Sequence, residues 1–427
     1  MVGESARLPG SSDVKSDGAT DVVGAPHHDG DGSIGEVGTS VAGDSPHVLG
    51  EAPSRSEDSA VTDAVGAVDQ GIALIVQAQE DALVPPPPDA STGQPNGRRL
   101  EWVAFALVMV LAAAFRFTGV NWDNGTQLHP DERFLFMVEG AIRPGIVTPG
   151  SNGAGDSTRD APIWQYYFDS ARSGLNPHNV GYGFFVYGTF PLFAAKLAIS
   201  ALQSFGIDRI HIVGRALSAL SDLGSVWISV LIARRLFGTR IALLAGVLMA
   251  TCVLHIQQAH FFVFDSVLVT LVLATFWFCL DIVAYARWRD FATVGLVLGL
   301  TLATKLSMVV FLPVVALAGL IHLLAAPPAE HDEHHDPRSS RVELTGVAPV
   351  DTAVARLVAA WDDGRFATIV AGGLLVGIVA LATFRVAQPY AFAGPGILDL
   401  RLNARWLDNI DYQAKSQSGE VDLPPSI

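Results

Sequence analysis

Cysteine and charge are both scarce in this chain of 427 residues. The two cysteines, Cys252 and Cys279, lie inside apolar runs and form neither a disulfide framework nor a metal-ligand pattern. Only 16% of the residues are charged, and lysine and arginine form no basic stripe of the kind that neutralises nucleic-acid phosphates. A disulfide-stapled scaffold and a nucleic-acid partner are therefore excluded.

Apolar residues, by contrast, make up 50% of the chain, and its mean hydropathy is positive. This balance is unusual for a soluble protein of this length and predicts a membrane protein. A helix needs about 20 apolar residues to cross about 30 Å of hydrocarbon. We predict seven such spans, at approximately 101–120, 212–233, 240–259, 262–284, 291–304, 306–325 and 366–386.

Residues 1–98 differ in composition from the rest of the chain. They are rich in Gly, Ser, Asp, Ala and Pro, and residues 1–99 contain 16 acidic and 5 basic side chains, which account for most of the net charge of −15. Such a composition predicts a disordered acidic tail that ends in the stiff tract Pro85–Pro88. The apolar stretch Gly71–Val84 is at most a marginal helix at this length. The start of the chain has no basic residues followed by an apolar stretch, so we expect no cleavable signal.

The positions of lysine and arginine predict the orientation. Arg99 places the tail in the cytoplasm, and Arg234 and Arg287 mark two further inside loops. The chain must therefore cross an even number of times between Arg99 and Arg234, although three apolar stretches lie there. We assign the middle one, 182–204, to the outer interface as a bent or surface-lying helix. The result is a multi-pass protein of the cell membrane with one long outer loop, 121–211.

Later loops agree with this orientation. Residues 326–365 fall inside and contain the cluster His331–Asp336, whose spacing gives no fixed tetrahedral site, so we expect a solvated loop and no metal. Residues 387–427 fall outside and stop in polar sequence. We therefore expect the natural protein to be longer.

Two carboxylates follow the first span in the sequence LHPDER. Asp131 and Glu132, after Pro130, suit the first turn of a helix, where capping alone explains them. They could also take the proton of an acceptor hydroxyl, or hold an acceptor or a cation. Adjacent helical residues diverge by about 100 degrees, so the two side chains should have different roles. A second outer carboxylate, Asp265, starts the helix after His260 and the aromatic run that follows it.

Three cations lie at outer span ends in the same topology: Arg215, Lys305 and Arg385. A charge near hydrocarbon is costly and usually has a partner. Each side chain either reaches the interface along its apolar stem or contacts a lipid phosphate. Asp222, about 10 Å deeper than Arg215, is either the partner of a cation or part of an ion path.

The order of these features resembles the polytopic GT-C glycosyltransferases of the protein mannosyltransferase and aminoarabinose transferase type, a group similar to glycosyltransferase family 39. The matching segments are WDNGTQLHPDERFL, NPHNVGYGFFVYGTFPLF, VGRALSALSDLGSVWISVLIARRLFG, HIQQAHFFVFDSVLVTL, LATKLSMVVFLP and RVAQPYAFAGPG. Together they extend from about residue 101 to residue 405.

The resemblance implies an all-α bundle of transmembrane helices that moves a sugar from a polyprenyl-phosphate donor to a protein, lipid or glycan acceptor at the outer face. Inversion by direct displacement would require no cofactor and no obligatory metal. Asp131 matches the catalytic acidic position and Glu132 its neighbour, while Arg215, Lys305 and Arg385 match donor-phosphate contacts. The remaining candidates for the acceptor or donor site are His129, His260, Asp265, Gln388 and Tyr390.

The sequence departs from this family in one respect. Its members usually have eleven or more spans, whereas seven are predicted here, so the chain is either a fragment or an incomplete fold. Two other functions remain open. A transporter or flippase of a lipid-linked sugar is suggested by Asp222, although no repeated halves are present. A non-catalytic membrane scaffold is suggested by the acidic tail, which could recruit a soluble partner.

Overall fold

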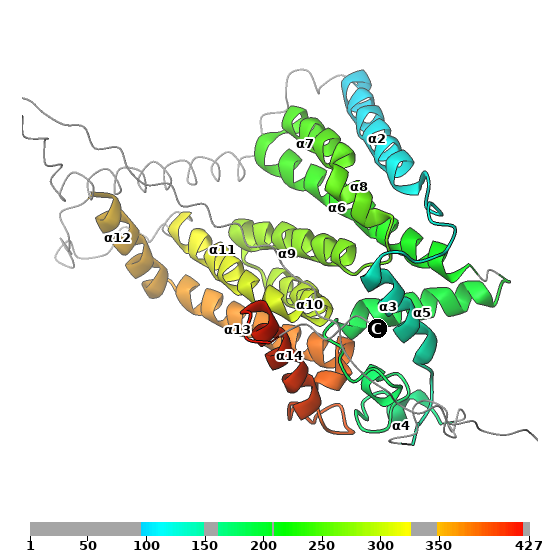
Figure 1. Cartoon of the computed structure of the whole chain (residues 1–427). Coiled ribbons are helices and arrows are strands. Elements are labelled where there is room, and N and C mark those ends of the chain that lie inside the picture. Colours follow the sequence, from blue (N-terminus) through cyan, green and yellow to red (C-terminus); the bar gives the residue numbers. More distant parts are fainter. Residues whose placement is uncertain (1–94, 149–160, 207–208, 326–347, 422–427) are drawn as a thin grey trace, which may run out of the picture. The chain divides into compact units, whose positions relative to one another are not determined.

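The computed structural model describes residues 95–148, 161–206, 209–325 and 348–421, and within them it contains helices and two isolated β-bridges (Figure 1). This composition confirms the predicted all-α fold. Contacts divide the chain into the units Met1–Ala60 and Val61–Ile427, and every described helix belongs to the second. The predicted tail up to residue 94, with its stretch Gly71–Val84, and the cluster His331–Asp336 lie outside the described residues.

Five helices among the described residues are long and apolar enough to cross a membrane, and a bent pair is a sixth if it forms one span. The bent pair is α7 (Thr239–Thr251) and α8 (Val253–Ala259), which meet at 55°. The five are α2 (Pro95–Phe117), α6 (Ile210–Phe237), α9 (Asp265–Tyr285), α13 (Arg365–Ala387) and the continuous pair η2 (Leu306–Phe311) and α11 (Leu312–Ala325). The chain is therefore a multi-pass membrane protein.

The remaining predicted span, 291–304, is α10 (Trp288–Thr304), which has 17 residues and is about 26 Å long. This is shorter than the hydrocarbon layer of about 30 Å. Helix α10 nevertheless lies within the bundle, against α9 and α13. A Cβ at Gly299 would come within 2.6 Å of the carbonyl oxygen of Ala380 on α13. Glycine is required there because the two backbones approach so closely.

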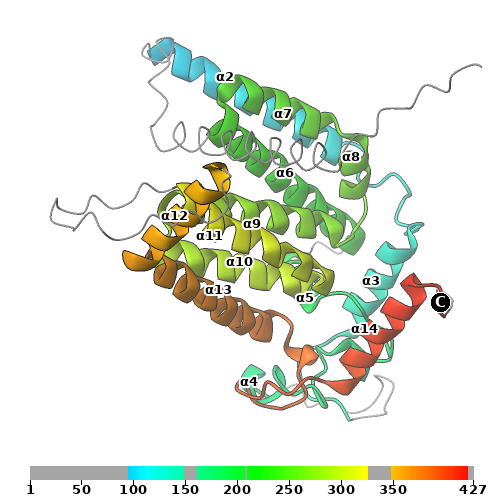
Figure 2. The ribbon, with the colours of Figure 1, turned by 90° about the vertical axis from the view of Figure 1, so that its left-hand side faces the viewer.

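The segment between α2 and α6 covers one end of the bundle, which we call the α3 end. It contains α3 (Pro130–Ala141), α4 (Ile163–Tyr166), η1 (Pro177–Asn179) and α5 (Thr189–Gln203). Helix α5 has 15 residues and is not among the candidate spans, as predicted for 182–204. The backbone N–H of Thr189 donates to Gln388 Oε1, 2.5 Å away, which ties α5 to the end of α13. After α13 come η3 (Pro389–Ala391) and α14 (Ala404–Gln417), also at this end (Figure 2).

Basic residues and their partners gather at the opposite end of the bundle. Arg234 lies 3.5 Å from Glu101 of α2, and Arg235 lies 2.7 Å from Asp281 of α9. Helix α12 (Ala348–Asp362) contacts α11 and α13 there. The predicted grouping of the loops at two ends is thus present in the structure, while the membrane side of each end stays a prediction.

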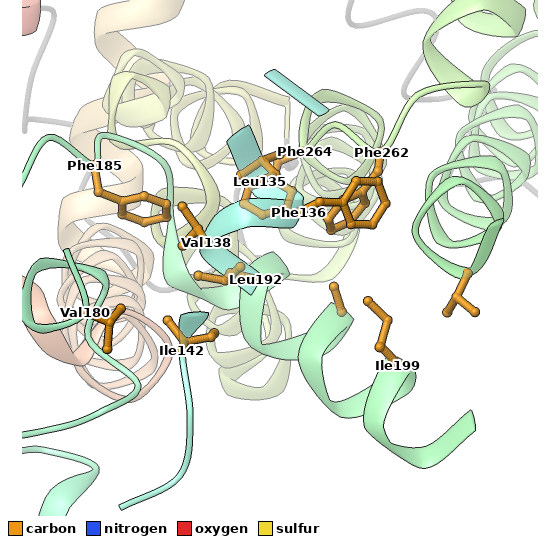
Figure 3. Packing of buried hydrophobic residues seen from close by; sticks show 12 residues of the cluster. Leu135, Phe136, Val138, Ile142, Val180, Phe185, Leu192, Ile199, Phe262 and Phe264 are labelled. Atoms are coloured by element: carbon orange, nitrogen blue, oxygen red, sulfur yellow. The ribbon is translucent and has the colours of Figure 1, made fainter. Parts of the chain in front are cut away.

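An apolar cluster fixes the α3 end. Leu135, Phe136 and Val138 of α3, with Ile142 directly after it, pack against α5 and against the segment between α8 and α9 (Figure 3). The contributing residues outside α3 include Leu192, Ile199, Phe262 and Phe264. Burial of about 25 cal/mol per Å² of apolar surface therefore holds α3, and the carboxylates at its start, in place.

Candidate active site

Arg215 is the centre of a buried ionic cluster. Its Nε and Nη2 atoms each lie 2.7 Å from a carboxylate oxygen of Glu132, and its Nη1 and Nη2 atoms lie 2.8 and 2.7 Å from the two oxygens of Asp123. Nη1 also donates to the carbonyl of Val120 at 2.8 Å. All three charged side chains have no exposed surface. The five N–H groups of the guanidinium thus all have partners.

Backbone groups complete this cluster. The N–H of Phe262 donates to Glu132 Oε1 at 2.9 Å, and the N–H groups of Gly125 and Gln127 donate to Asp123. The hydrogen bonds from Arg215, more than those from the backbone, hold the pKa of Asp123 well below its ordinary value. The cluster joins α6, α3, the loop after α2 and the loop before α9 into one body.

These contacts change two of the predicted roles. Glu132 cannot reach an acceptor from a site closed to solvent, and Arg215 has no N–H group left for a lipid phosphate. We therefore reassign both residues from catalysis and phosphate binding to structure. A buried charge pair needs matched partners to offset its desolvation, which explains why both carboxylates face one guanidinium.

Asp131 has the opposite environment. It is the second residue of α3, its side chain is exposed, and it lies near the hydroxyl of Tyr187. Burial, followed by the charges of Asp131 and Asp265, raises the pKa of Tyr187. The phenol therefore stays protonated near neutral pH. Both aspartates lie close enough to Tyr187 to affect its titration.

Lys305 and Asp265 form the other side of this group, with Nζ and Oδ1 3.3 Å apart and about half of each side chain exposed. Asp265 is the first residue of α9, and Lys305 lies between α10 and η2. We call Asp131, Tyr187, Asp265 and Lys305 the exposed polar site. It contains two carboxylates, one phenol and one ammonium group, contributed by four different segments of the chain.

A close backbone contact positions this site. The N–H of Gly188 donates to the carbonyl of Thr304 at 3.1 Å, and a Cβ at Gly188 would lie 1.8 Å from the carbonyl oxygen of Ala303. Only glycine allows this approach. It holds Tyr187 beside the end of α10, and therefore beside Lys305.

Arg385 is buried away from the exposed polar site. Its guanidinium donates to the carbonyls of Pro389, Gly396 and Ile397, and lies 4.8 Å from the ring centres of Phe168 and Phe392. Arg385 therefore has a structural role in place of the predicted phosphate contact. It holds the segment after α13 against the end of that helix. Of the three predicted phosphate contacts, Lys305 alone is exposed.

The other predicted site residues support the structure around the site. His129 caps α3 through the backbone N–H of Glu132, and both ring nitrogens of His260 lie within 2.8 Å of carbonyl oxygens. Gln388 is buried and accepts from Thr189, and the buried hydroxyl of Tyr390 lies 2.8 Å from that of Ser173. These four residues therefore lie around the site without joining its exposed polar group.

Asp222 lies in a second buried cluster, within the bundle. Its carboxylate is 2.5 Å from Nε of Arg116 and 2.6 Å from Nδ1 of His255. Arg116 also donates to the carbonyls of Met249 and Ala250, which lie in the last turn of α7, where the helix breaks before α8. Of the two roles left open for Asp222, the structure supports that of a cation partner.

Sequence reasoning assigned no role to Tyr187, Asp123 or Arg116. Tyr187 stands before Gly188 at the start of α5, and a Tyr-Gly pair before an apolar helix was the signal available. Arg116 is in the last turn of α2, where a cation is also explained by the helix dipole. Among the described residues, His, Cys, Asp and Glu form no group of three or more that could hold a metal ion.

An apolar groove of about 530 Å³ lies between α10, α11 and α13. Every side chain that lines it is apolar or a glycine, from Phe291 near the start of α10 to Leu302 near its end, and Leu306 of η2 borders it as well. These two positions on α10 are about 16 Å apart along the helix. Because Leu306 follows Lys305, the groove ends beside the exposed polar site.

Comparison with known families gives one match. Residues 199–332 match the model of the family described as dolichyl-phosphate-mannose-protein mannosyltransferase. The match covers less than a third of the chain, and over these residues the chain is similar to a family of GT-C-type membrane glycosyltransferases. The match confirms the resemblance to the GT-C proteins and includes Arg215, Asp222, Asp265 and Lys305. Neither the curated proteins nor the solved structures gave a match to the chain.

Proposed function

We propose that this GT-C-type protein transfers a sugar from a polyprenyl-phosphate donor to an acceptor hydroxyl at the outer face of the membrane, with Asp131 as the general base. The observation that carries the proposal is the exposed carboxylate of Asp131 at the end of the bundle that also carries the exposed ion pair of Asp265 and Lys305, with Tyr187 close to both aspartates. A carboxylate and a cation exposed at the same end of the bundle suit a reaction in which one substrate loses a proton and the other carries a phosphate.

The proposed reaction is a single displacement. Asp131 takes the proton of the acceptor hydroxyl, the acceptor oxygen bonds to the anomeric carbon, and the bond between that carbon and the phosphate oxygen breaks. The polyprenyl phosphate leaves with the electron pair, and the anomeric configuration inverts. In this proposal Tyr187, whose hydroxyl stays protonated and lies near Asp131, orients the base.

Lys305 supplies charge for the leaving phosphate. Its pairing with Asp265 joins two half-exposed side chains and is worth at most about 1 kcal/mol, so a doubly charged phosphate can replace the carboxylate. The apolar groove beside Lys305 offers a place for the polyprenyl chain. The description of the matched family names dolichyl-phosphate mannose, and we propose the same class of donor for this chain.

The proposal is tested with the full chain reconstituted in lipid vesicles. Polyprenyl-phosphate sugars are supplied together with membrane and protein extracts as acceptors, and release of free polyprenyl phosphate is measured. Release that depends on the protein and on the acceptor is expected. Movement of the intact donor across the bilayer, with no polyprenyl phosphate formed, would favour the flippase function instead.

A further inference from the structure

A short hairpin follows α13 at the α3 end. Phe392 and Leu402 form an antiparallel bridge, and the N–H of Ala393 donates to the carbonyl of Arg401 at 2.8 Å. Asn403 closes the hairpin through its N–H, which donates to Ala391. The tip of the hairpin lies between the two bridged residues and contains Ile397 and Leu398.

Arg385 fixes the depth of this tip. Its Nη2 and Nε atoms donate to the carbonyls of Gly396 and Ile397 at 2.6 and 3.1 Å. Arg385 lies in the last turn of α13, whose 23 residues extend over about 35 Å, slightly more than the hydrocarbon layer. The tip therefore lies at the level where the span meets the lipid headgroups.

Helix α4 reaches the same level from a distant part of the sequence. The hydroxyl of Tyr167 donates to the carbonyl of Val386 at 2.9 Å, and the ring of Phe168 lies against Arg385. Helix α4 ends directly before Tyr167, so Ile163 and Trp164 in its first two positions lie within about one helical turn of this contact.

Large apolar side chains at this level are exposed. Leu398 is 90% exposed and Trp164 is 74% exposed. Ile163 is 56% exposed and Ile397 is 50% exposed. We call these four residues the apolar collar. Asp399, which follows Leu398, is paired with Arg401 at 2.5 Å, so these two charges offset each other. Exposed apolar surface of this kind marks an interaction site in a folded protein.

The surface of α13 indicates the partner. Its exposed side chains include Val370, Leu374, Ile378 and Val386, which recur at helical spacing along the whole span. This stripe faces the lipid, since no described helix covers it. The apolar collar continues the stripe beyond the end of the helix and adds a tryptophan, the residue most typical of the membrane interface.

We propose that the apolar collar is a membrane-binding surface, seated at the boundary between headgroups and acyl chains in the leaflet at the α3 end. The partner is the lipid surface itself. This inference does not depend on the transfer reaction. It gives the hairpin and α4 a function outside the exposed polar site, because they attach the segment 161–203 and α14 to the membrane at a fixed height.

The test uses an environment-sensitive fluorophore on single cysteines in the full chain, with Cys252 and Cys279 replaced by alanine, reconstituted in lipid nanodiscs. Leu398→Cys reports on the collar, and Asp408→Cys on the exposed surface of α14 is the matched control. Both sites are exposed, so labelling does not disturb packing. Quenching by iodide in water and by lipids with spin labels near the headgroups is measured for each.

We expect the label at position 398 to be quenched at least threefold more by the spin-labelled lipids than the label at position 408, and to resist iodide. The same pattern for Trp164→Cys would extend the result to α4. Strong iodide quenching at position 398, equal to that at position 408, would overturn the proposal. Protection from both quenchers would also overturn it, because protein and not lipid would then cover the collar.

Discussion

Asp131 and Glu132 are adjacent in the sequence, yet Asp131 is exposed and Glu132 is completely buried against Arg215. The helical turn of about 100 degrees between them separates a carboxylate free to react from one that holds the fold. The pair therefore has two functions, and substitutions at the two positions should differ in kind. Loss of Glu132 should disturb structure, whereas loss of Asp131 should disturb chemistry alone.

Arg215→Gln should destabilise the protein strongly. The substitution leaves Asp123 and Glu132 buried without their cation, and breaking a buried charge network costs roughly 3–5 kcal/mol. Unfolding in detergent, followed by the fluorescence of the tryptophans, measures the change in the free energy of unfolding. Arg385→Gln is a useful comparison, since Arg385 contacts carbonyls and rings and leaves no carboxylate unpaired. An Arg215→Gln protein as stable as the wild type would contradict the structural role.

Asp222 and Arg116 should be coupled. Asp222→Asn removes the charge partner of a completely buried guanidinium and should cost roughly 3–5 kcal/mol of stability. Asp222→Leu and Arg116→Met should each destabilise the protein. The double variant should lose less stability than the sum of these two losses, because it leaves no unpaired charge in the bundle. Strict additivity would show that the pair makes no direct contact. A selective loss of lipid-linked sugar movement, with stability unchanged, would instead support an ion path.

Lys305→Gln should weaken donor binding and leave the fold intact. A charge-assisted hydrogen bond to phosphate is worth about 1.5–3 kcal/mol, so the Michaelis constant for the donor should rise roughly 10-fold to 100-fold. The unfolding free energy should change by less than about 1 kcal/mol, because the ion pair with Asp265 is half exposed. Native mass spectrometry should show less bound polyprenyl-phosphate sugar. Unchanged donor affinity in this variant would show that the donor phosphate binds elsewhere.

His178 should make stability depend on pH. Burial, together with the nearby charge of Arg405, lowers the pKa of His178 to about 4, below its ordinary value of 6.5. The unfolded chain then binds the proton first. The contribution of neutral His178 is complete above pH 6.5, is lost as the pH falls from 6.5 to about 4, and stays lost below that. Protonation would also end the 2.7 Å hydrogen bond that Asn409 Nδ2 donates to Nε2.

The pH dependence of unfolding between pH 4 and 7 measures this effect. His178→Gln keeps a polar side chain but cannot titrate, so the slope of stability against pH in this range should decrease. An identical slope in the variant would assign the dependence to another group.

The sequence predicted which end of the bundle each polar residue occupies, because the depth of a residue follows from its position along a span. Asp131, Asp265 and Lys305 were placed at one end by the positions of Arg99, Arg234 and Arg287 alone. The structure agrees, since the segments that carry all three meet at the α3 end.

Pairing could not be predicted in the same way. Depth says nothing about the rotation of a helix around its axis or about which neighbour it contacts. Arg215 and Lys305 lie at the same end, but Arg215 faces Glu132 in the interior and Lys305 faces solvent. Arg116 reaches the broken end of α7 through contacts more than 130 residues apart in the sequence. Tertiary packing therefore decides which of these cations are buried among fixed partners and which is exposed.

The most direct test of the account is sugar transfer by Asp131→Asn. Asparagine has the shape of aspartate, but it cannot act as a base. Vesicles with equal amounts of folded wild-type and variant protein are supplied with polyprenyl-phosphate sugar and acceptor, and the transferred sugar is measured. The account predicts a loss of at least about 100-fold in rate, typical of removing a general base, with donor binding and unfolding unchanged. Transfer at the wild-type rate would contradict it.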